Sequence, residues 1–405
     1  MHLAFPTAST PAHVAASDAS FDPIAAAEQL AERLATTAVE RDRAGGHPKH
    51  ERELIRASGL LTLSIPAEFG GQGASWSTVM AAVRILAKAD SALAHLFGFH
   101  HLQLAGIQLY GTELQQRSLL TATVRQKLFW GNALNPLDKR TRATASPAGY
   151  ILDGVKSFSS GSVGSDWLTV SAWDKEADAA LIAVVPTEQA GVHVEADWDA
   201  FGQRQTDSGN VHFEKVYLPT ALVLQTPGQA PTARSTLRSQ VAQLVMTNLY
   251  LGIAQGAFDA ARDYTLAQAR PWFASGVDDA IDDPFTQHRY GQLWLTVRPA
   301  VLLADEAGRQ LDAAIRKGDA VTVRERGEVA IAVAEAKVLA HRAAIEISNQ
   351  MFELLGARAT SGRFGFDRFW RNARVHTLHD PVDYKLRDLG RYALSGRVPD
   401  PTPYS

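Results

Sequence analysis

The sequence contains no cysteine and only four methionines among its 405 residues. The absence of cysteine excludes disulfide bonds and thiolate-bound metal centres. Two kinds of protein gain from so little sulfur: one made when sulfur is scarce, and one that generates a peroxide and must avoid oxidisable thiols. Drift in an alanine-rich chain is the simpler explanation.

A strong charge of either sign is also lacking. The formal net charge is −3, and charged residues make up 20% of the chain. This balance provides no field to hold nucleic acid or an anionic membrane surface. Residues 1–20 lack the basic segment and apolar core of a signal peptide, so we interpret them as a flexible arm and expect a cytoplasmic protein.

Two long segments, 91–112 and 239–258, lack charged residues, and each is long enough to span a bilayer. Both carry several histidine or amide side chains, which favours central helices of a soluble bundle over membrane spans. The chain also lacks the Gly-x-Gly-x-x-Gly fingerprint and the Gly-x-x-x-x-Gly-Lys loop. These absences argue against a dinucleotide-binding Rossmann domain and a P-loop.

What is present is a change of periodicity along the chain. Residues 21–127 have helical spacing, with Asp22-Pro23 as N-cap and first-turn proline of a helix that is predicted to run to Arg43. Residues 128–230 favour short strands, which are expected at 128–134, 142–144, 149–158, 167–172, 180–186 and 210–216. Residues 231–405 return to long alanine-rich helices, at about 235–269, 284–317 and 320–355. We therefore predict an α+β protein of three parts.

Eight segments, spread over nearly the whole chain, carry a family resemblance. They are AVERDRAGG at 38–46, AHLFGF at 94–99, WGNA at 130–133, SSGSVGSD at 159–166, GQRQTDSG at 202–209, ARPW at 269–272, FDRFWRN at 366–372 and HTLHDPVDY at 376–384. Together they resemble the reduced-FMN monooxygenase branch of the acyl-CoA dehydrogenase superfamily. This branch includes dibenzothiophene monooxygenase and relatives that oxidise small alkylsulfur compounds such as methanesulfinate. The resemblance implies an N-terminal helical domain, a middle β-barrel-like domain and a C-terminal four-helix bundle.

The chemistry that the resemblance implies needs a partner enzyme. A separate NAD(P)H-dependent flavin reductase supplies reduced FMN, which reacts with O₂ to give a C4a-hydroperoxyflavin. One oxygen atom then passes to a soft nucleophilic centre of the substrate. The protein's part is orientation, proton control and exclusion of solvent. A homotetramer is implied as well.

The resemblance also indicates three catalytic candidates. His379 matches the family's active-site histidine, and an imidazole titrates near neutral pH, so it can protonate or stabilise a flavin peroxide. We expect Asp380-Pro381 to cap and start the next helix, and a histidine hydrogen-bonded in that cap is the alternative for His379. His95 matches a histidine at the substrate pocket, with a neutral core histidine as alternative. Ser160 matches a serine near the flavin's reactive edge, although Ser-Ser-Gly is more often a plain turn.

Further residues resemble cofactor contacts. Asn132 matches an asparagine that contacts the isoalloxazine, and residues 156–160, with Lys156 and Phe158, resemble a flavin-contacting strip. Arg270 resembles the arginine that reaches FMN phosphate from a neighbouring subunit, and Ala357-Arg358 resembles another phosphate contact. A guanidinium suits phosphate because it binds in a bidentate manner, but a solvated surface charge is the default for any arginine.

The remaining candidates concern the pocket walls and a possible metal. Phe99 and His379 complete the expected cofactor contacts, and His95, Phe99, Trp198 and Phe201 are expected to line the substrate pocket. Aromatic residues at such spacing are more often only core. His376 and His379 have the spacing of a metal-binding pair, but no third ligand is evident, so no metal is expected.

Three features of the sequence limit the possible reactions and substrates. No glutamate occurs between residues 356 and 390, which argues against proton abstraction by an FAD-dependent acyl-CoA dehydrogenase. Phe99 stands where the aromatic-thioether branch carries tyrosine, and residues 133–142 look shorter than that branch's active-site lid. We therefore favour a small alkanesulfinate such as methanesulfinate as substrate. A dibenzothiophene-type or indole-type aromatic monooxygenase, the dehydrogenase and a non-catalytic scaffold are the alternatives.

Overall fold

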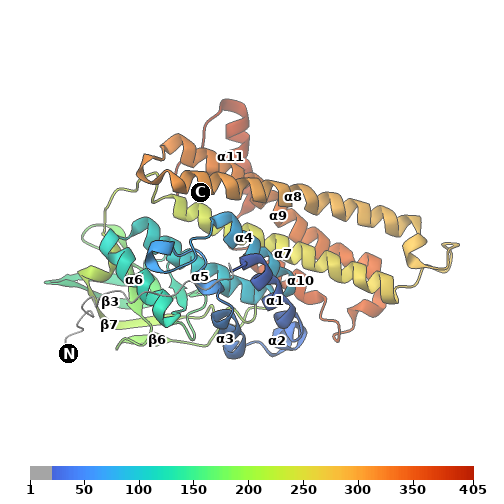
Figure 1. Cartoon of the computed structure of the whole chain (residues 1–405), viewed down its shortest axis with the longest axis horizontal. Coiled ribbons are helices and arrows are strands. Elements are labelled where there is room, and N and C mark those ends of the chain that lie inside the picture. The colour runs from blue at the N-terminus through green and yellow to red at the C-terminus, as the bar shows by residue number, and fades with distance from the viewer. Residues whose placement is uncertain (1–20) are drawn as a thin grey trace.

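The computed structural model describes residues 21–405, so the arm expected at 1–20 lies outside the described residues. Along the chain, a group of helices is followed by a sheet and then by long helices (Figure 1). The predicted α+β class is confirmed. The sheet lies beside the N-terminal helices at one end of the long helices.

Six α-helices precede the sheet in the described chain: α1 (Pro23–Ala35), α2 (Ala38–Ala44), α3 (Lys49–Ala57), α4 (Trp76–Ala89), α5 (Ser91–Tyr110) and α6 (Glu113–Gln126). The Asp22 carboxylate caps α1 as predicted, because it accepts hydrogen bonds from the next turn's backbone. The prediction of one helix to Arg43 is wrong. The Thr36 hydroxyl donates back to the Arg33 carbonyl, and Thr37 leaves the helical conformation with φ −123°.

Helix α5 is the buried centre of the N-terminal region. It packs against α4, α7 and the first strand, and nearly all of its residues are buried. Gly98 allows this, because a Cβ there would lie 2.7 Å from Val245 Cγ1 on α7. The central-helix interpretation of residues 91–112 is therefore confirmed. No helix within residues 21–405 combines the length and apolar character that crossing a bilayer requires.

The sheet contains, in the described chain, β1 (Trp130–Ala133), β2 (Arg142–Ser146), β3 (Gly149–Lys156), β4 (Trp167–Asp174), β5 (Ala179–Pro186), β6 (Val192–Val194), β7 (Val211–Pro219) and β8 (Val223–Gln225). Its order is β6-β7-β3-β2-β4-β5-β8, with β1 parallel to β4. The six predicted strands are confirmed. Strands β6 and β8 were missed because three residues show no periodicity.

Five helices complete the described chain: α7 (Leu237–Gln268), α8 (Pro284–Arg316), α9 (Val323–Leu355), α10 (Asp367–Thr377) and α11 (Val382–Ser395). The three long ones match their predicted ranges. Helices α7 and α9 run in the same direction, because Arg326 near the start of α9 donates to Thr236, which immediately precedes α7. At the other end, Tyr264 in the last turns of α7 packs on Phe364, which follows α9. The starts of α7 and α9 therefore lie together at one end of the bundle, and the segment that follows α9 lies at the other end.

Candidate active site

A cleft of about 1010 Å³ lies between the sheet and helices α5, α7 and α10. Side chains spaced three, four or seven residues apart project from one face of each helix. From the helices the cleft receives His95, Phe99, Leu102, Arg238, Ala242, Met246 and His376, and from the β region it receives Asn132, Phe158, Ser160, Trp198 and Phe201. The start of α7 is therefore the cleft end of the bundle.

The β wall depends on a close approach of β1 to the turn after β3. Asn132 N–H donates to the Ser160 carbonyl at 2.9 Å. A Cβ at Gly131 would lie 2.9 Å from the Gly161 carbonyl oxygen, so glycine is required there. Phe158 precedes the turn with φ 56°, an unfavourable value for an aromatic residue, and its side chain is 71% exposed. Strain of this kind is found at binding sites more often than elsewhere.

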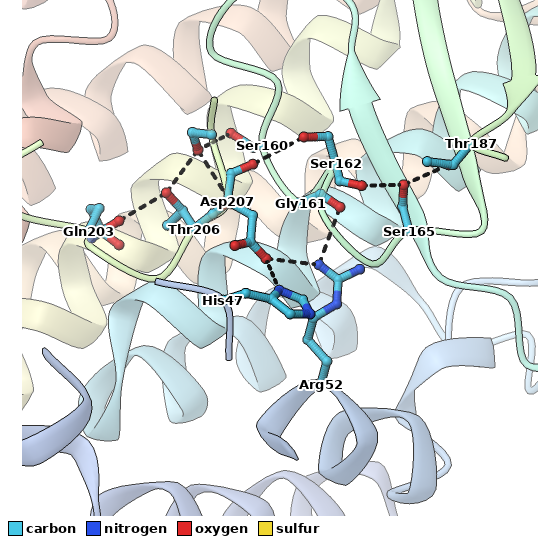
Figure 2. Close-up of polar contacts among 11 residues, drawn as sticks. His47, Arg52, Ser160, Gly161, Ser162, Ser165, Thr187, Gln203, Thr206 and Asp207 are labelled. Carbon is cyan, nitrogen blue, oxygen red and sulfur yellow. Dashed lines mark hydrogen bonds and ion pairs between the residues drawn. The ribbon is translucent and has the colours of Figure 1, made fainter. Parts of the chain in front are cut away.

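Buried charges hold the next loop against the N-terminal helices (Figure 2). The Asp207 carboxylate lies 2.8 Å from His47 Nδ1 and 3.5 Å from Arg52 Nη1. Arg52 also donates to the Gly161 carbonyl, so one guanidinium fixes both loops of the β wall. Burial lowers the pKa of Arg52 to about 10, against the opposing effect of Asp207. The sequence did not single out these residues, although Asp207 lies inside the GQRQTDSG segment.

Two histidines of the helical wall are buried and neutral. His95 stacks on Phe99 with ring centroids 3.9 Å apart and meets the edge of His376 at 4.8 Å. Burial lowers the pKa of His376 to about 3 and holds that of His95 well below its usual range. Within residues 21–405, both ring nitrogens of His95 and Nδ1 of His376 have no hydrogen-bond partner. These nitrogens are available to a ligand.

His379 differs, because its side chain is 41% exposed and charged groups orient it. Its Nδ1 lies 3.0 Å from Asp380 Oδ1, which also accepts a hydrogen bond from the buried Lys337 at 2.5 Å. Burial alone would raise the pKa of Asp380, but hydrogen bonds from His379 and Lys337 hold it below its usual range. Asp380 is therefore ionised and accepts the Nδ1 hydrogen, so Nε2 is the ring nitrogen of His379 that is left to face a ligand.

The expected cap at Asp380 is wrong. Helix α11 has Pro381 as its N-cap residue and no side-chain cap hydrogen bond. The Asp380 carboxylate turns to Lys337 because an unpaired buried ammonium costs more free energy than an uncapped helix end. Lys337, which sequence reasoning missed, also donates to Gln243 Oε1 at 2.5 Å.

Arg238 is a second residue that sequence reasoning missed. It lines the cleft, is 8% exposed, and donates to Gln103 Oε1 at 3.4 Å. Burial lowers its pKa, with the Tyr110 hydroxyl acting in the opposite direction. Within residues 21–405 its Nε has no hydrogen-bond partner. A signal existed, because Arg238 stands immediately before the uncharged segment 239–258 and therefore lies in the first turn of a buried helix.

Other predicted residues occupy varied places. Lys156 is buried but does not line the cleft, and its Nζ donates to the carbonyls of Asn135 and Asp138. Burial lowers the pKa of Lys156 to about 8. Trp198 lines the cleft, donates to the Gln203 carbonyl and meets the edge of Phe158 at 6.0 Å. Lys156 therefore supports the segment after β1 from behind.

The predicted phosphate contacts lie at the opposite end of the bundle. Arg270 follows α7, Ala357 and Arg358 follow α9, and all three are exposed. Figure 1 shows the α7–α8 connection at the end away from the sheet. At a rise of 1.5 Å per residue, the 32 residues of α7 separate Arg270 from the cleft end by about 48 Å. The structure thus does not bring these arginines to the cleft of their own chain.

Comparisons with known proteins agree with this architecture. Three acyl-CoA dehydrogenase domain families match the chain: the N-terminal domain at residues 24–127, the middle domain at 132–216 and the C-terminal domain at 244–384. The chain belongs to the acyl-CoA dehydrogenase family.

Similar proteins place it in the monooxygenase branch. SfnC, a probable FMNH2-dependent monooxygenase of Pseudomonas putida, is 48% identical over 94% of this chain and 97% of its own length. Methanesulfinate monooxygenase of Pseudomonas fluorescens gives a TM-score of 0.93 at 46% identity, over 95% of this chain and 100% of that one. TdsC is a dibenzothiophene monooxygenase of Paenibacillus sp. A11-2. Its structure with FMN and indole gives a TM-score of 0.92 at 41% identity, over 95% of this chain and 100% of that one. The resemblance to reduced-FMN monooxygenases is confirmed.

Proposed function

We propose that this chain is the oxygenase component of a two-component system, which takes FMNH₂ from a separate flavin reductase and oxidises an organosulfur compound. A small alkanesulfinate such as methanesulfinate is the favoured substrate. The observation that carries the proposal is the convergence of Asn132, Ser160, His95 and His379 on one cleft, from four distant segments.

The residues of this cleft fit a flavin together with a small substrate. Its volume of about 1010 Å³ is at the upper end of ordinary ligand pockets. Asn132 and Ser160 provide an amide and a hydroxyl on the β wall, and the unpaired nitrogens of His95 are buried polar atoms that a ligand can satisfy. Reduced FMN, when bound, supplies the activation of O₂.

His379 moves the proton. Because Asp380 holds its Nδ1 hydrogen, Nε2 is the nitrogen left to take up or return a proton in the cleft. Lys337 keeps Asp380 ionised, so the imidazole tautomer stays fixed through turnover. Trp198, Phe158 and Phe201 line the cleft with aromatic surface that excludes water.

Arg238 supports an anionic substrate. Within residues 21–405 the Nε of the buried Arg238 has no hydrogen-bond partner, and an anionic ligand in the same cleft offsets the cost of burying this cation. Phe99 offers a ring and no hydroxyl to the substrate. An aromatic thioether or indole is the second candidate, because Phe99, Trp198 and Phe201 all line the cleft and TdsC was solved with indole.

We propose a homotetramer in which Arg270 and Arg358 complete the phosphate site of a neighbouring copy. The opposite end of the bundle carries exposed apolar side chains, including Trp272 (69% exposed), Phe273 (86%) and Phe285 (76%). Large exposed apolar surface of this kind is typical of subunit contacts. Sedimentation at micromolar concentration tests this assembly, and a fully active monomer contradicts it.

One experiment tests the proposed reaction. The purified chain is supplied with a flavin reductase, NADH, FMN and O₂, with methanesulfinate and dibenzothiophene in parallel vessels. We expect oxygen-dependent methanesulfonate and little dibenzothiophene sulfoxide or sulfone. Product formation from dibenzothiophene alone would assign the chain to the branch that oxidises aromatic compounds. No product from either, together with acyl-CoA-dependent bleaching of bound FAD, restores the dehydrogenase alternative.

A further inference from the structure

Three hydroxyl groups and one carbonyl form a continuous chain of hydrogen bonds along the β wall (Figure 2). Thr206 Oγ1 lies 3.0 Å from the Gln203 carbonyl oxygen. Ser208 Oγ lies 2.8 Å from Thr206 Oγ1, and Ser160 Oγ lies 2.9 Å from Ser208 Oγ. All three hydroxyl residues are buried and line the cleft. We call this set the hydroxyl relay.

The relay has a preferred direction. Each hydroxyl donates a single hydrogen, and the Gln203 carbonyl only accepts. When all hydrogens point towards Gln203, each of the three oxygen–oxygen contacts contains one. In the reverse order, Thr206 Oγ1 and the Gln203 oxygen face each other at 3.0 Å with no hydrogen between them. The forward order is therefore favoured by about one hydrogen bond.

The backbone around the relay is held in place. Asp207, between Thr206 and Ser208, has φ 47°, and its carboxylate is held by His47 and Arg52. Because Arg52 also binds the Gly161 carbonyl, the loops that carry Ser160 and Ser208 are joined to the same cation. Their separation is thus fixed from behind, and the relay cannot relax by a shift of one loop alone.

The forward order determines what Ser160 presents to a ligand. Its hydrogen is committed to Ser208, so its oxygen offers only lone pairs to the cleft. Reduced isoalloxazine carries a hydrogen on the central-ring nitrogen at which the oxidised ring has only a lone pair. A fixed acceptor attracts the first and repels the second.

We propose that Thr206 and Ser208 are positioning residues that make Ser160 a hydrogen-bond acceptor, so that the cleft selects reduced over oxidised flavin. This inference rests on the proposed function and deepens it. It explains physically how an enzyme that receives FMNH₂ from another protein releases the oxidised product. The step is one of binding only, with no covalent change.

The test measures binding, not turnover. Dissociation constants of FMNH₂, under strict anaerobiosis, and of oxidised FMN are measured for the full-length chain. Ser208→Ala leaves the Ser160 hydrogen free to turn into the cleft, so we expect the preference for FMNH₂ to fall by about 2- to 12-fold, the range of one hydrogen bond. Thr206→Val should act in the same direction but more weakly, because Ser208 Oγ can still donate to the backbone carbonyl of residue 206 at 3.3 Å. Thr206→Ser, which keeps the hydroxyl, should restore the preference.

A matched control is available on β4. Thr169 is buried beside Asn132 in the β1–β4 register, and within residues 21–405 its hydroxyl has no partner. Thr169→Val should leave the ratio of the two dissociation constants unchanged. An unchanged ratio in both Ser208→Ala and Thr206→Val overturns the inference and leaves the proposed function intact. Failure of the unaltered chain to bind FMNH₂ at all overturns both.

Discussion

The two walls of the cleft treat their polar groups in opposite ways. On the β wall, Ser160 and Ser208 have hydrogen-bond partners within the protein, and the loops that carry them are held by paired charges. On the helical wall, ring nitrogens of His95 and His376 and Nε of Arg238 have none within residues 21–405. The hydroxyls of the β wall are therefore paired before a ligand arrives, and within residues 21–405 Gln203 Oε1 is the side-chain atom of that wall that lines the cleft without a partner. The ring nitrogens and the guanidinium of the helical wall are not paired in this way.

This difference indicates that the two walls of the cleft bind different ligands. An unsatisfied buried polar group costs about 1–3 kcal/mol, so several on one wall are tolerated where a ligand satisfies them. The β wall instead presents groups whose direction is already fixed, which suits a large rigid ring. We infer that the β wall positions the flavin and that the helical wall receives the substrate, with His379 at the boundary between them.

The largest expected effect is at that boundary. His379→Phe removes the oriented acid–base group and should lower product formation by about 100-fold or more. Reduced flavin should still bind and be consumed, with hydrogen peroxide released in place of oxygenated substrate. The measurement is coupling efficiency, the product formed per FMNH₂ oxidised, with a thermal melt to exclude unfolding.

His376→Phe is the matched control, because His376 is buried and neutral and lacks the Asp380 contact. It should disturb packing against His95 and weaken substrate binding, but at saturating substrate it should leave coupling closer to that of the unaltered chain. A well-coupled His379→Phe protein beside an uncoupled His376→Phe protein would reverse the assignment of the catalytic histidine.

Arg238 tests the substrate side of the comparison. Arg238→Met keeps most of the side-chain volume and removes the charge, which should raise KM for methanesulfinate by about 10- to 100-fold, the range of a hydrogen bond to a charged group. Binding of FMN and of riboflavin should both stay unchanged, because the charge serves the substrate. A selective loss of FMN binding, with riboflavin unaffected, would instead assign Arg238 to the flavin phosphate.

Acid should weaken the α5 and α10 regions first. The pKa of His100 is lowered by burial to about 4 and that of His376 to about 3. In the unfolded chain histidine protonates near pH 6.5, so below that pH the unfolded state binds more protons than the folded one. Folded stability is therefore complete above pH 6.5. It should fall by about 1.4 kcal/mol per pH unit for each such histidine, down to its folded pKa.

Denaturant unfolding at pH 7, 6 and 5 measures this slope. The slope should become shallower by one histidine's share in His376→Gln, because that variant binds no extra proton on unfolding. Identical slopes in the two proteins would show that His376 is not held neutral by its surroundings.

The elements were predictable from the sequence because periodicity is local. Helices α7, α8 and α9 matched their predicted ranges, since each repeats its pattern over some thirty residues. The break at Thr36 was not predicted, because it depends on one hydroxyl that bonds to the backbone. The same limit applies to β6 and β8, which are fixed by pairing with β7 and β5.

The site was predictable only as far as family resemblance carried it. Resemblance named His379 and Ser160, but the groups that orient them come from remote positions in the chain: Lys337 lies 43 residues before Asp380, and Arg52 lies 155 before Asp207. A lysine in an alanine-rich helix shows no sign that it turns inward. Local rules therefore assigned Asp380 to a cap, and tertiary pairing overrode them.

The smallest effect is expected on the β wall, at Ser160. Ser160→Ala removes one neutral hydrogen bond and no titrating group, so coupling should fall by only about 2- to 12-fold. The loss should not depend on which sulfur compound is supplied, because the β wall faces the flavin and not the substrate. Coupling is measured for Ser160→Ala with methanesulfinate and with a neutral thioether, beside Arg238→Met under the same conditions. If Ser160→Ala impairs one substrate and spares the other, the two walls do not divide cofactor from substrate. By contrast, a loss of coupling that depends on the substrate only in Arg238→Met supports the assignment of the flavin to the β wall and of the substrate to the helical wall.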